Sequence, residues 1–254
     1  MSVIQVERIK LFSTRSPWWC MIVSAVLTIG LAALTTGFLK GADEQQASIF
    51  ITQPGAQLSQ MVMMVMAALA VTTEYRFSTI RTSFLAVPQR ASLLLGKTAV
   101  VAFLAGIVGL VASFGAWGIG SLLAGSADLS INTSAEWRLL AGQGLIFALS
   151  AIIAVAIGIM IRQSAGAIAI AILWPLVVEN LFGLIPKVGD DMAKYAPFAN
   201  GSSFLNQGQD FGLAGANAGG SDFAFGPWGA LLYFAAWAVG LLLISLVIAN
   251  KRDA

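Results

Sequence analysis

The sequence contains no histidine and only one cysteine, Cys20, among its 254 residues. Without histidine the chain cannot form Ser-His or Cys-His hydrolase sites, histidine-ligated zinc or haem sites, or a histidine proton relay. A single cysteine excludes a disulfide within the chain. The phosphate-binding pattern GxxxxGK[ST] is also missing, so the chain does not by itself bind and hydrolyse ATP in the P-loop manner.

Charged residues are scarce. They make up 10% of the chain, whereas soluble domains carry roughly 25%. Hydrophobic residues account for 58%, and this composition indicates an integral membrane protein. The net charge of +2 gives no electrostatic support for nucleic-acid binding.

Six apolar runs are long enough to cross a bilayer, which takes about 20 residues in a helix. They cover residues 18–38, 54–73, 98–124, 139–161, 165–185 and 227–249. Lipid offers no water to unpaired backbone groups, so these runs must be helices. No internal repeat relates the two halves, and we therefore expect one all-α transmembrane domain over residues 1–254.

The placement of lysine and arginine predicts the orientation. With the N-terminus inside, ten of the 14 fall on the cytoplasmic side. These ten are Arg8, Lys10, Arg15, Arg76, Arg81, Arg90, Lys97, Arg162, Lys251 and Arg252. By the positive-inside rule both termini are cytoplasmic. Residues 2–16 resemble a short amphipathic helix lying along the inner interface, before an apolar run too long for a cleaved signal peptide.

The densest polar stretch, residues 72–90, lies between the second and third spans on the cytoplasmic side. Phe77, Ile80, Phe84 and Val87 are spaced by three, four and three residues, which predicts one apolar stripe on a helix parallel to the membrane. Two interpretations remain. The segment is either a connector whose arginines hold anionic lipid headgroups, or a docking surface for a cytoplasmic partner.

Polar residues of the second span gather on one face of the predicted helix. Gln53, Gln57, Gln60 and Met64 are spaced by four, three and four residues, so they share one side of a helix, with Met61 nearby. Glutamine is costly against lipid, and this side should therefore contact protein or water. It is either part of a substrate pathway or a helix–helix interface with hydrogen bonds.

The third span has small residues at Ala102, Gly106, Gly109 and Ser113, which favours close helix packing. In the fifth span, Pro175 predicts a kink. Glu179 is expected near the outer headgroups as a partly solvated carboxylate rather than as a transport acid. Without an acid at the membrane midplane, the energy for transport should come from a partner.

The outer segment 186–226 is rich in glycine and contains Pro186 and Pro197. Residues 195–205 are expected to form a short helix that dips into the outer leaflet. The Gly212–Gly220 run is expected to be a flexible external loop.

Three runs together resemble a known family. Residues 7–19 read ERIKLFSTRSPWW, residues 74–81 read EYRFSTIR before VPQR at 87–90, and residues 195–200 read YAPFAN. These runs are similar to those of ABC-2-type ABC transporter permease subunits from actinobacteria. Ser78 stands where that family usually has glycine.

The resemblance implies a fold like that of the G-subfamily exporters, with a cytoplasmic coupling helix between spans two and three and a re-entrant segment between spans five and six. Two permeases, identical or different, would pair in the bacterial plasma membrane, and two separate ATPase subunits would bind ATP and Mg²⁺. This chain itself would hold no cofactor or metal and would have no catalytic residue.

The resemblance also implies three sets of site residues. Contacts to the ATPase would come from Glu74, Tyr75, Arg76, Thr79, Arg81 and Arg90. The substrate pathway would be lined by Gln53, Gln57, Gln60, Met61, Met64, Trp174 and Val178. The outer gate would include Tyr195, Pro197 and Phe198.

We therefore expect the membrane subunit of an ATP-driven exporter that moves an amphipathic or apolar substrate outward, such as a drug, natural product or lipid. The alternative is a non-transporting scaffold or assembly protein that holds lipid headgroups or a peripheral protein with its basic cytoplasmic loop.

Overall fold

The computed structural model describes residues 3–38, 48–80, 90–125, 127–182, 185, 189–206 and 224–251. Within these ranges the chain is helical and contains no strand. Six helical segments of the described chain are long and apolar enough to cross a membrane. The all-α fold with six predicted spans is confirmed at this level.

The described residues form the following helical elements. In chain order they are α1 (Val3–Ser13), α2 (Arg15–Gly37), the 3₁₀ turn η1 (Ile49–Thr52), α4 (Ala56–Arg76), α6 (Arg90–Leu123), α7 (Ser134–Ile161), α8 (Ser164–Leu173), the π-helix η2 (Trp174–Val178), α9 (Glu179–Phe182), α10 (Gly189–Lys194), α11 (Pro197–Asn206) and α12 (Pro227–Lys251). The fifth span is therefore assembled from α8, η2 and α9.

Two spans begin earlier than hydropathy predicts. Helix α6 starts at residue 90 instead of 98, and α7 starts at residue 134 instead of 139. For α7 the cause is a capping box. Thr133 accepts a hydrogen bond from the Glu136 amide (3.3 Å), and the Glu136 carboxylate accepts one from the Thr133 amide (2.7 Å). Hydropathy does not detect such a polar first turn, because it is helical without being apolar.

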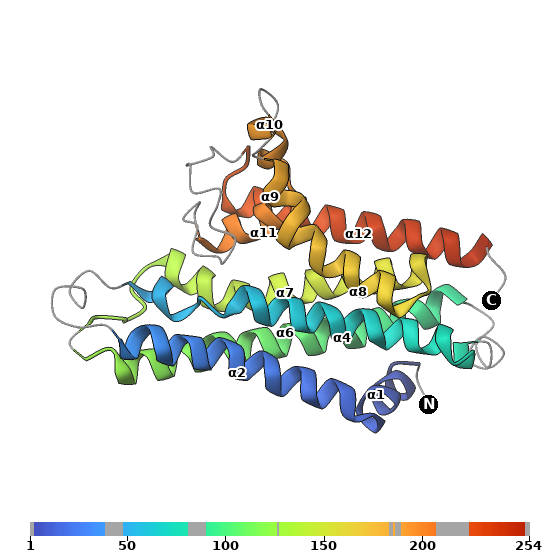
Figure 1. The fold of residues 1–254 in the computed structure, drawn as a ribbon, viewed down its shortest axis with the longest axis horizontal. Helices are drawn as coiled ribbons and strands as arrows, with labels where there is room; N and C mark the ends of the chain where they lie inside the picture. Colours follow the sequence, from blue (N-terminus) through green and yellow to red (C-terminus); the bar gives the residue numbers. More distant parts are fainter. Residues whose placement is uncertain are drawn as a thin grey trace.

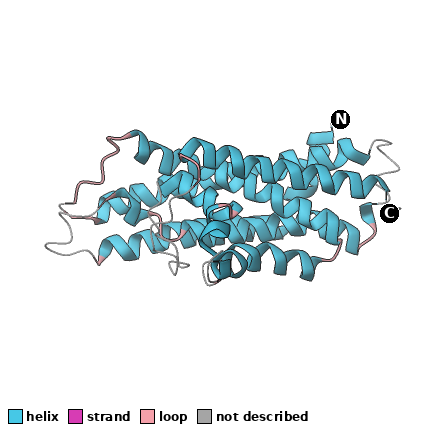
Figure 2. Cartoon of the chain, turned by 90° about the horizontal axis from the view of Figure 1, so that it is seen from above, coloured by secondary structure: helices cyan, strands magenta, loops and turns pink. Residues whose placement is uncertain are grey.

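Helix α7 is the centre of the bundle. It packs against α4, α6, α8, α11 and α12, and it is the most buried of the six spans. Figures 1 and 2 show the long helices running side by side, with the first and last described residues at the same end of the bundle. The core follows α7, with Ile146, Phe147 and Ile159 among its largest fully buried side chains.

Glycines let α6 approach α7 closely, as the small residues of the third span predicted. A Cβ atom built on Gly109 would lie 2.7 Å from the Phe147 ring, and one on Gly144 would lie 2.5 Å from Leu110. Both distances are below any ordinary van der Waals contact. By contrast, a Cβ atom on Gly118 meets nothing within 4 Å.

The two glycines on α6 allow a matched test. Gly109→Ala should lower the free energy of unfolding by about 1–3 kcal/mol, because the added methyl group overpacks the α6–α7 contact. Gly118→Ala on the same helix should be neutral or slightly stabilising, since alanine has the higher helix propensity. Thermal unfolding of the purified protein in detergent measures both; equal Tm values for the two variants would contradict the packing assignment.

Candidate functional site

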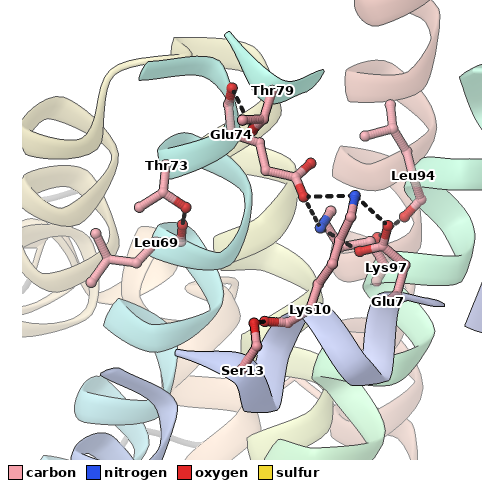
Figure 3. Close-up of polar contacts among 10 residues, drawn as sticks. Glu7, Lys10, Ser13, Leu69, Thr73, Glu74, Thr79, Leu94 and Lys97 are labelled. Atoms are coloured by element: carbon pink, nitrogen blue, oxygen red, sulfur yellow. Dashed lines mark hydrogen bonds and ion pairs between the residues drawn. The ribbon is translucent and has the colours of Figure 1, made fainter. Parts of the chain in front are cut away.

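Four charged side chains meet at the end of the bundle that holds both described termini. Lys97 on α6 donates to Glu74 Oε1 on α4 (2.9 Å) and to Glu7 Oε2 on α1. Lys10, one turn along α1, lies 3.4 Å from both Glu7 and Glu74. Figure 3 shows the two lysine nitrogens between the two carboxylates. We call Glu7, Lys10, Glu74 and Lys97 the ion cluster.

The ion cluster is largely shielded from solvent. The exposed fraction of the side chain is 2% for Glu7, 6% for Lys97, 12% for Glu74 and 39% for Lys10. Two carboxylates balance two ammonium groups, so no net charge is buried. Removing one partner of such a buried pair leaves an uncompensated charge, which costs far more than breaking a surface pair. The cluster thus fastens α1 to the ends of α4 and α6.

The predicted ATPase contacts overlap in part with the ion cluster. Glu74 belongs to it, and the Tyr75 ring lies 5.1 Å from the guanidinium carbon of Arg162. Arg76 and Thr79 are exposed. Arg81 lies outside the described residues, and α6 begins at Arg90. The predicted contact of these residues with an ATPase stays a prediction, while Glu74 has a structural role inside this chain.

A sharp turn separates α4 from the next helical residues, Thr79 and Ile80. Ser78 has a φ of 59°, in the left-handed region where glycine is least strained. This explains physically why glycine is usual at this position in the family that the sequence resembles. Of the predicted apolar stripe, Phe77 is exposed and Ile80 is buried, whereas Phe84 and Val87 lie outside the described residues. The predicted coupling helix therefore stays a prediction.

The glutamines of the second span make contacts between helices. Gln53 donates to the Ser113 carbonyl of α6 (3.2 Å) and accepts from the Ser113 hydroxyl (3.2 Å). Gln60 donates to the Ser150 hydroxyl of α7 (2.7 Å). Gln57 Oε1 is buried without a partner among the described residues. The helix–helix interpretation of this face thus holds at Gln53 and Gln60.

The other residues predicted to line the substrate pathway separate into two groups. Met64 and Trp174 lie on the wall of an apolar cavity of about 200 Å³. Met61 is buried, and Val178 is half-buried in η2, but neither lines this cavity. A substrate pathway through the whole set stays a prediction.

Glu179 does not have the partly solvated environment expected from the sequence. It is 5% exposed, and its carboxylate accepts from the Phe198 amide (3.0 Å), the Ala199 amide (2.8 Å) and the Trp174 indole (3.0 Å). Ala196, which precedes α11, has no side-chain oxygen to cap the helix. Glu179 therefore caps α11 from the fifth span, where the helix dipole also favours a negative charge.

The predicted outer-gate residues lie around α11. Pro197 and Phe198 begin this helix, and the Phe198 ring packs edge-on against Phe234 of α12 at 5.3 Å. Tyr195 is exposed, and its carbonyl accepts a hydrogen bond from the Tyr233 hydroxyl (2.8 Å). The short helix expected at 195–205 is thus present as α11, packed on α7 and α12. Its depth in the membrane stays a prediction, and the Gly212–Gly220 run lies outside the described residues.

A family model described as "ABC-2 family transporter protein" matches residues 3–177, which include α1, the ion cluster and the first four spans. The chain belongs to the ABC-2 transporter family. No curated protein matches it. As an ABC-2 family member, the chain is a multi-pass transport subunit of the membrane rather than a catalytic enzyme, and such permeases generally work with an ATPase subunit.

Sequence reasoning missed the structural roles of three side chains in this ABC-2 permease. Lys97 was counted only as a cytoplasmic charge, Glu7 appeared only in the run ERIKLFSTRSPWW, and Glu179 was expected near the outer headgroups. The sequence did contain one signal for the ion cluster. Lys97 borders a long apolar run, and a charge in such a place needs a carboxylate nearby. The sequence does not show which carboxylate pairs with Lys97, and Glu7 lies 90 residues away along the chain.

The ion cluster predicts unequal effects for its two lysines. Lys97→Met should destabilise the protein by about 3–5 kcal/mol, because it leaves two buried carboxylates with only the partly solvated Lys10 to balance their charge. Lys10→Met should cost about 0–1 kcal/mol, since Lys10 is partly solvated. Thermal unfolding measures both, and a double-mutant cycle of Lys97→Met with Glu7→Gln should show a coupling energy. Additive effects in that cycle would contradict a direct Glu7–Lys97 interaction.

The cap on α11 predicts a local effect at Glu179. Glu179→Gln should destabilise by about 1–3 kcal/mol and speed hydrogen exchange at the Phe198 and Ala199 amides, because the amide group keeps only one acceptor oxygen. Glu136→Gln is the matched control, since glutamine also completes an exposed capping box. Unchanged exchange at α11 in Glu179→Gln would rule out the cap.

Proposed function

We propose that this chain is the membrane subunit of an ABC exporter that moves an amphipathic or apolar substrate outward, using ATP hydrolysed by a separate subunit. The proposal rests on the ABC-2 family match together with one structural observation. The ion cluster fastens α1, α4 and α6 into one unit beside the exposed Arg76 and Thr79. A partner that pushes on this surface would move three helices together.

Two ATPase subunits would dock on the cytoplasmic surface of a permease pair. Arg76 would contact the ATPase directly, while Glu74 would hold that surface in place through Lys97. ATP binding would draw the two ATPases together and rock the helices of each permease, closing the inner side and opening the outer side. ATP and Mg²⁺ would be held by the partner, in keeping with the missing P-loop.

A second permease copy, identical or different, would cover part of the bundle in the plasma membrane. The spans α2, α8–α9 and α12 are the least buried within one chain. Many of their exposed side chains are large and apolar, such as Trp19, Leu173 and Leu232. Such faces need either lipid or another membrane helix as neighbour, and a copy placed against α8–α9 would bring the two fifth spans together.

The docking surface is tested by charge reversal. Arg76→Glu should weaken co-purification of the ATPase about tenfold or more. The substitution removes the ion pair that Arg76 would form with an acidic group of the ATPase, and it sets a second negative charge against that group. It should also abolish substrate-stimulated ATP hydrolysis. Lys251→Glu, which reverses an exposed charge at the same end of the bundle on α12, is the control and should have little effect.

Two outcomes would count against the proposal. Full ATPase binding and full stimulation by Arg76→Glu would remove Arg76 from the contact. Purification of the wild-type permease alone, with no nucleotide-binding subunit under any mild condition, would favour the non-transporting scaffold instead.

A further inference from the structure

The apolar cavity of about 200 Å³ is enclosed by five elements of a single chain. Met64 of α4 and Ile153, Ile157 and Met160 of α7 form its floor. Ile170, Ala171 and Trp174 come from the fifth span, Pro197 and Phe198 from α11, and Trp237 and Leu241 from α12. None of these side chains is charged, and the walls expose no polar atom to the space.

The size and lining of the cavity limit what can occupy it. A bound water needs two to four polar partners, whereas an apolar cavity of about 150 Å³ stays dry and takes up hydrocarbon. Sites for drug-sized molecules measure about 300–1,000 Å³. A volume of about 200 Å³ therefore suits part of a hydrocarbon chain but neither a charged headgroup nor a whole drug-sized molecule.

The cavity opens sideways, between the fifth span and α12. Met64 and Ile153 at its floor are buried, whereas Ile170, Trp174 and Trp237 are each about two-fifths exposed. These three residues belong to two of the three spans that are mostly uncovered within the chain. Where no second copy covers this face, the medium beyond the opening is lipid hydrocarbon.

The fifth span departs from a regular α-helix where it forms this wall of the cavity. The α-helix changes to a π-helix at Trp174–Val178, around Pro175, and π-turns occur often at functional sites. The Glu179 carboxylate accepts hydrogen bonds from the Trp174 indole N–H and the Phe198 amide. The Trp174 indole N–H and the Phe198 amide of the cavity wall are thus both paired with Glu179, and they do not face the apolar space.

We propose that this cavity binds the end of one hydrocarbon chain, which enters from the bilayer between Trp174 and Trp237. The chain belongs either to a membrane lipid or to the apolar tail of a transported amphiphile, and its polar end stays at the opening. The inference deepens the proposed function by naming the substrate chemistry, but occupancy requires neither ATP nor the ATPase. Its failure is therefore distinguishable from a failure of the export proposal.

Photolabelling in nanodiscs tests this occupancy. One arm uses a phospholipid with a diazirine at the end of one acyl chain, and the other uses a long-chain alcohol carrying the same diazirine. After irradiation, mass spectrometry should find adducts on the buried Met64 and Ile157, in addition to adducts on the exposed Leu232. Labelling by the phospholipid identifies a lipid chain, and labelling by the alcohol alone identifies the tail of a free amphiphile.

Two alanines of α8 supply the matched variants. Ala171→Leu adds bulk inside the cavity and should reduce the Met64 and Ile157 adducts about tenfold, as expected for overpacking. Ala169→Leu makes the same change on the exposed side of α8 and should leave them unchanged. Leu232 adducts should be constant in both variants, because this residue lies away from the cavity on the exposed surface of α12.

A third variant acts in the opposite direction and covers the case in which Ala171→Leu does not fold. Trp237→Ala should widen the opening and increase the cavity adducts. Adducts confined to exposed residues such as Leu232 would overturn the proposal. So would equal cavity labelling in Ala169→Leu and Ala171→Leu, or in wild type and Trp237→Ala.

Discussion

Lys97 is almost fully buried, and the carboxylates of Glu7 and Glu74 lie against its ammonium group. A membrane protein has little water with which to solvate such groups, so each polar atom inside must find its partner within the chain. The same constraint explains Gln60 of α4, which bonds to Ser150 of α7, and Gln53 just before α4, which bonds to Ser113 of α6. It also explains Glu179, which is held by two backbone amides and an indole. The polar contacts thus mark where helices must meet, while apolar packing around α7 supplies most of the buried surface.

These contacts divide the molecule into one end, which holds both described termini and the ion cluster, and a second region held by the capped helix α11. Helix α4 connects the two. Met64 on the cavity wall and Glu74 in the ion cluster lie ten residues apart on it, about 15 Å along the axis. A displacement of the cluster is therefore also a displacement of one cavity wall. The opposite wall belongs to η2 and α11, which Glu179 joins. In the proposed mechanism the ATPase acts on α1, α4 and α6. The substrate chain lies between α4 and the wall formed by η2 and α11.

Much of the fold could be predicted because hydrophobic run length is a local property. The six spans, the packing role of Gly109 and the interruption at Pro175 follow from residues near one another in sequence. The start of α7 at Ser134 was missed although the Thr133–Glu136 capping box is also local, because hydropathy weighs only polarity. Residues 74–81 were predicted as a functional segment on a motif, but the role of Glu74 within the chain was not. Its lysine partner lies on the next span, and nothing in the spacing specifies which charge it meets.

The sequence by itself determined that this is a multi-pass helical membrane protein without a P-loop pattern, and it placed basic residues at one end of the bundle. Composition and the periodicity of apolar residues are sufficient for that. The tertiary structure decided which polar groups pair: Glu7 with Lys97, Gln60 with Ser150, and Glu179 with the start of α11. It also decided that Met64, Trp174 and Trp237 enclose one cavity. Both results depend on how the helices pack around α7, and packing brings together residues whose separation along the chain carries no signal of their contact.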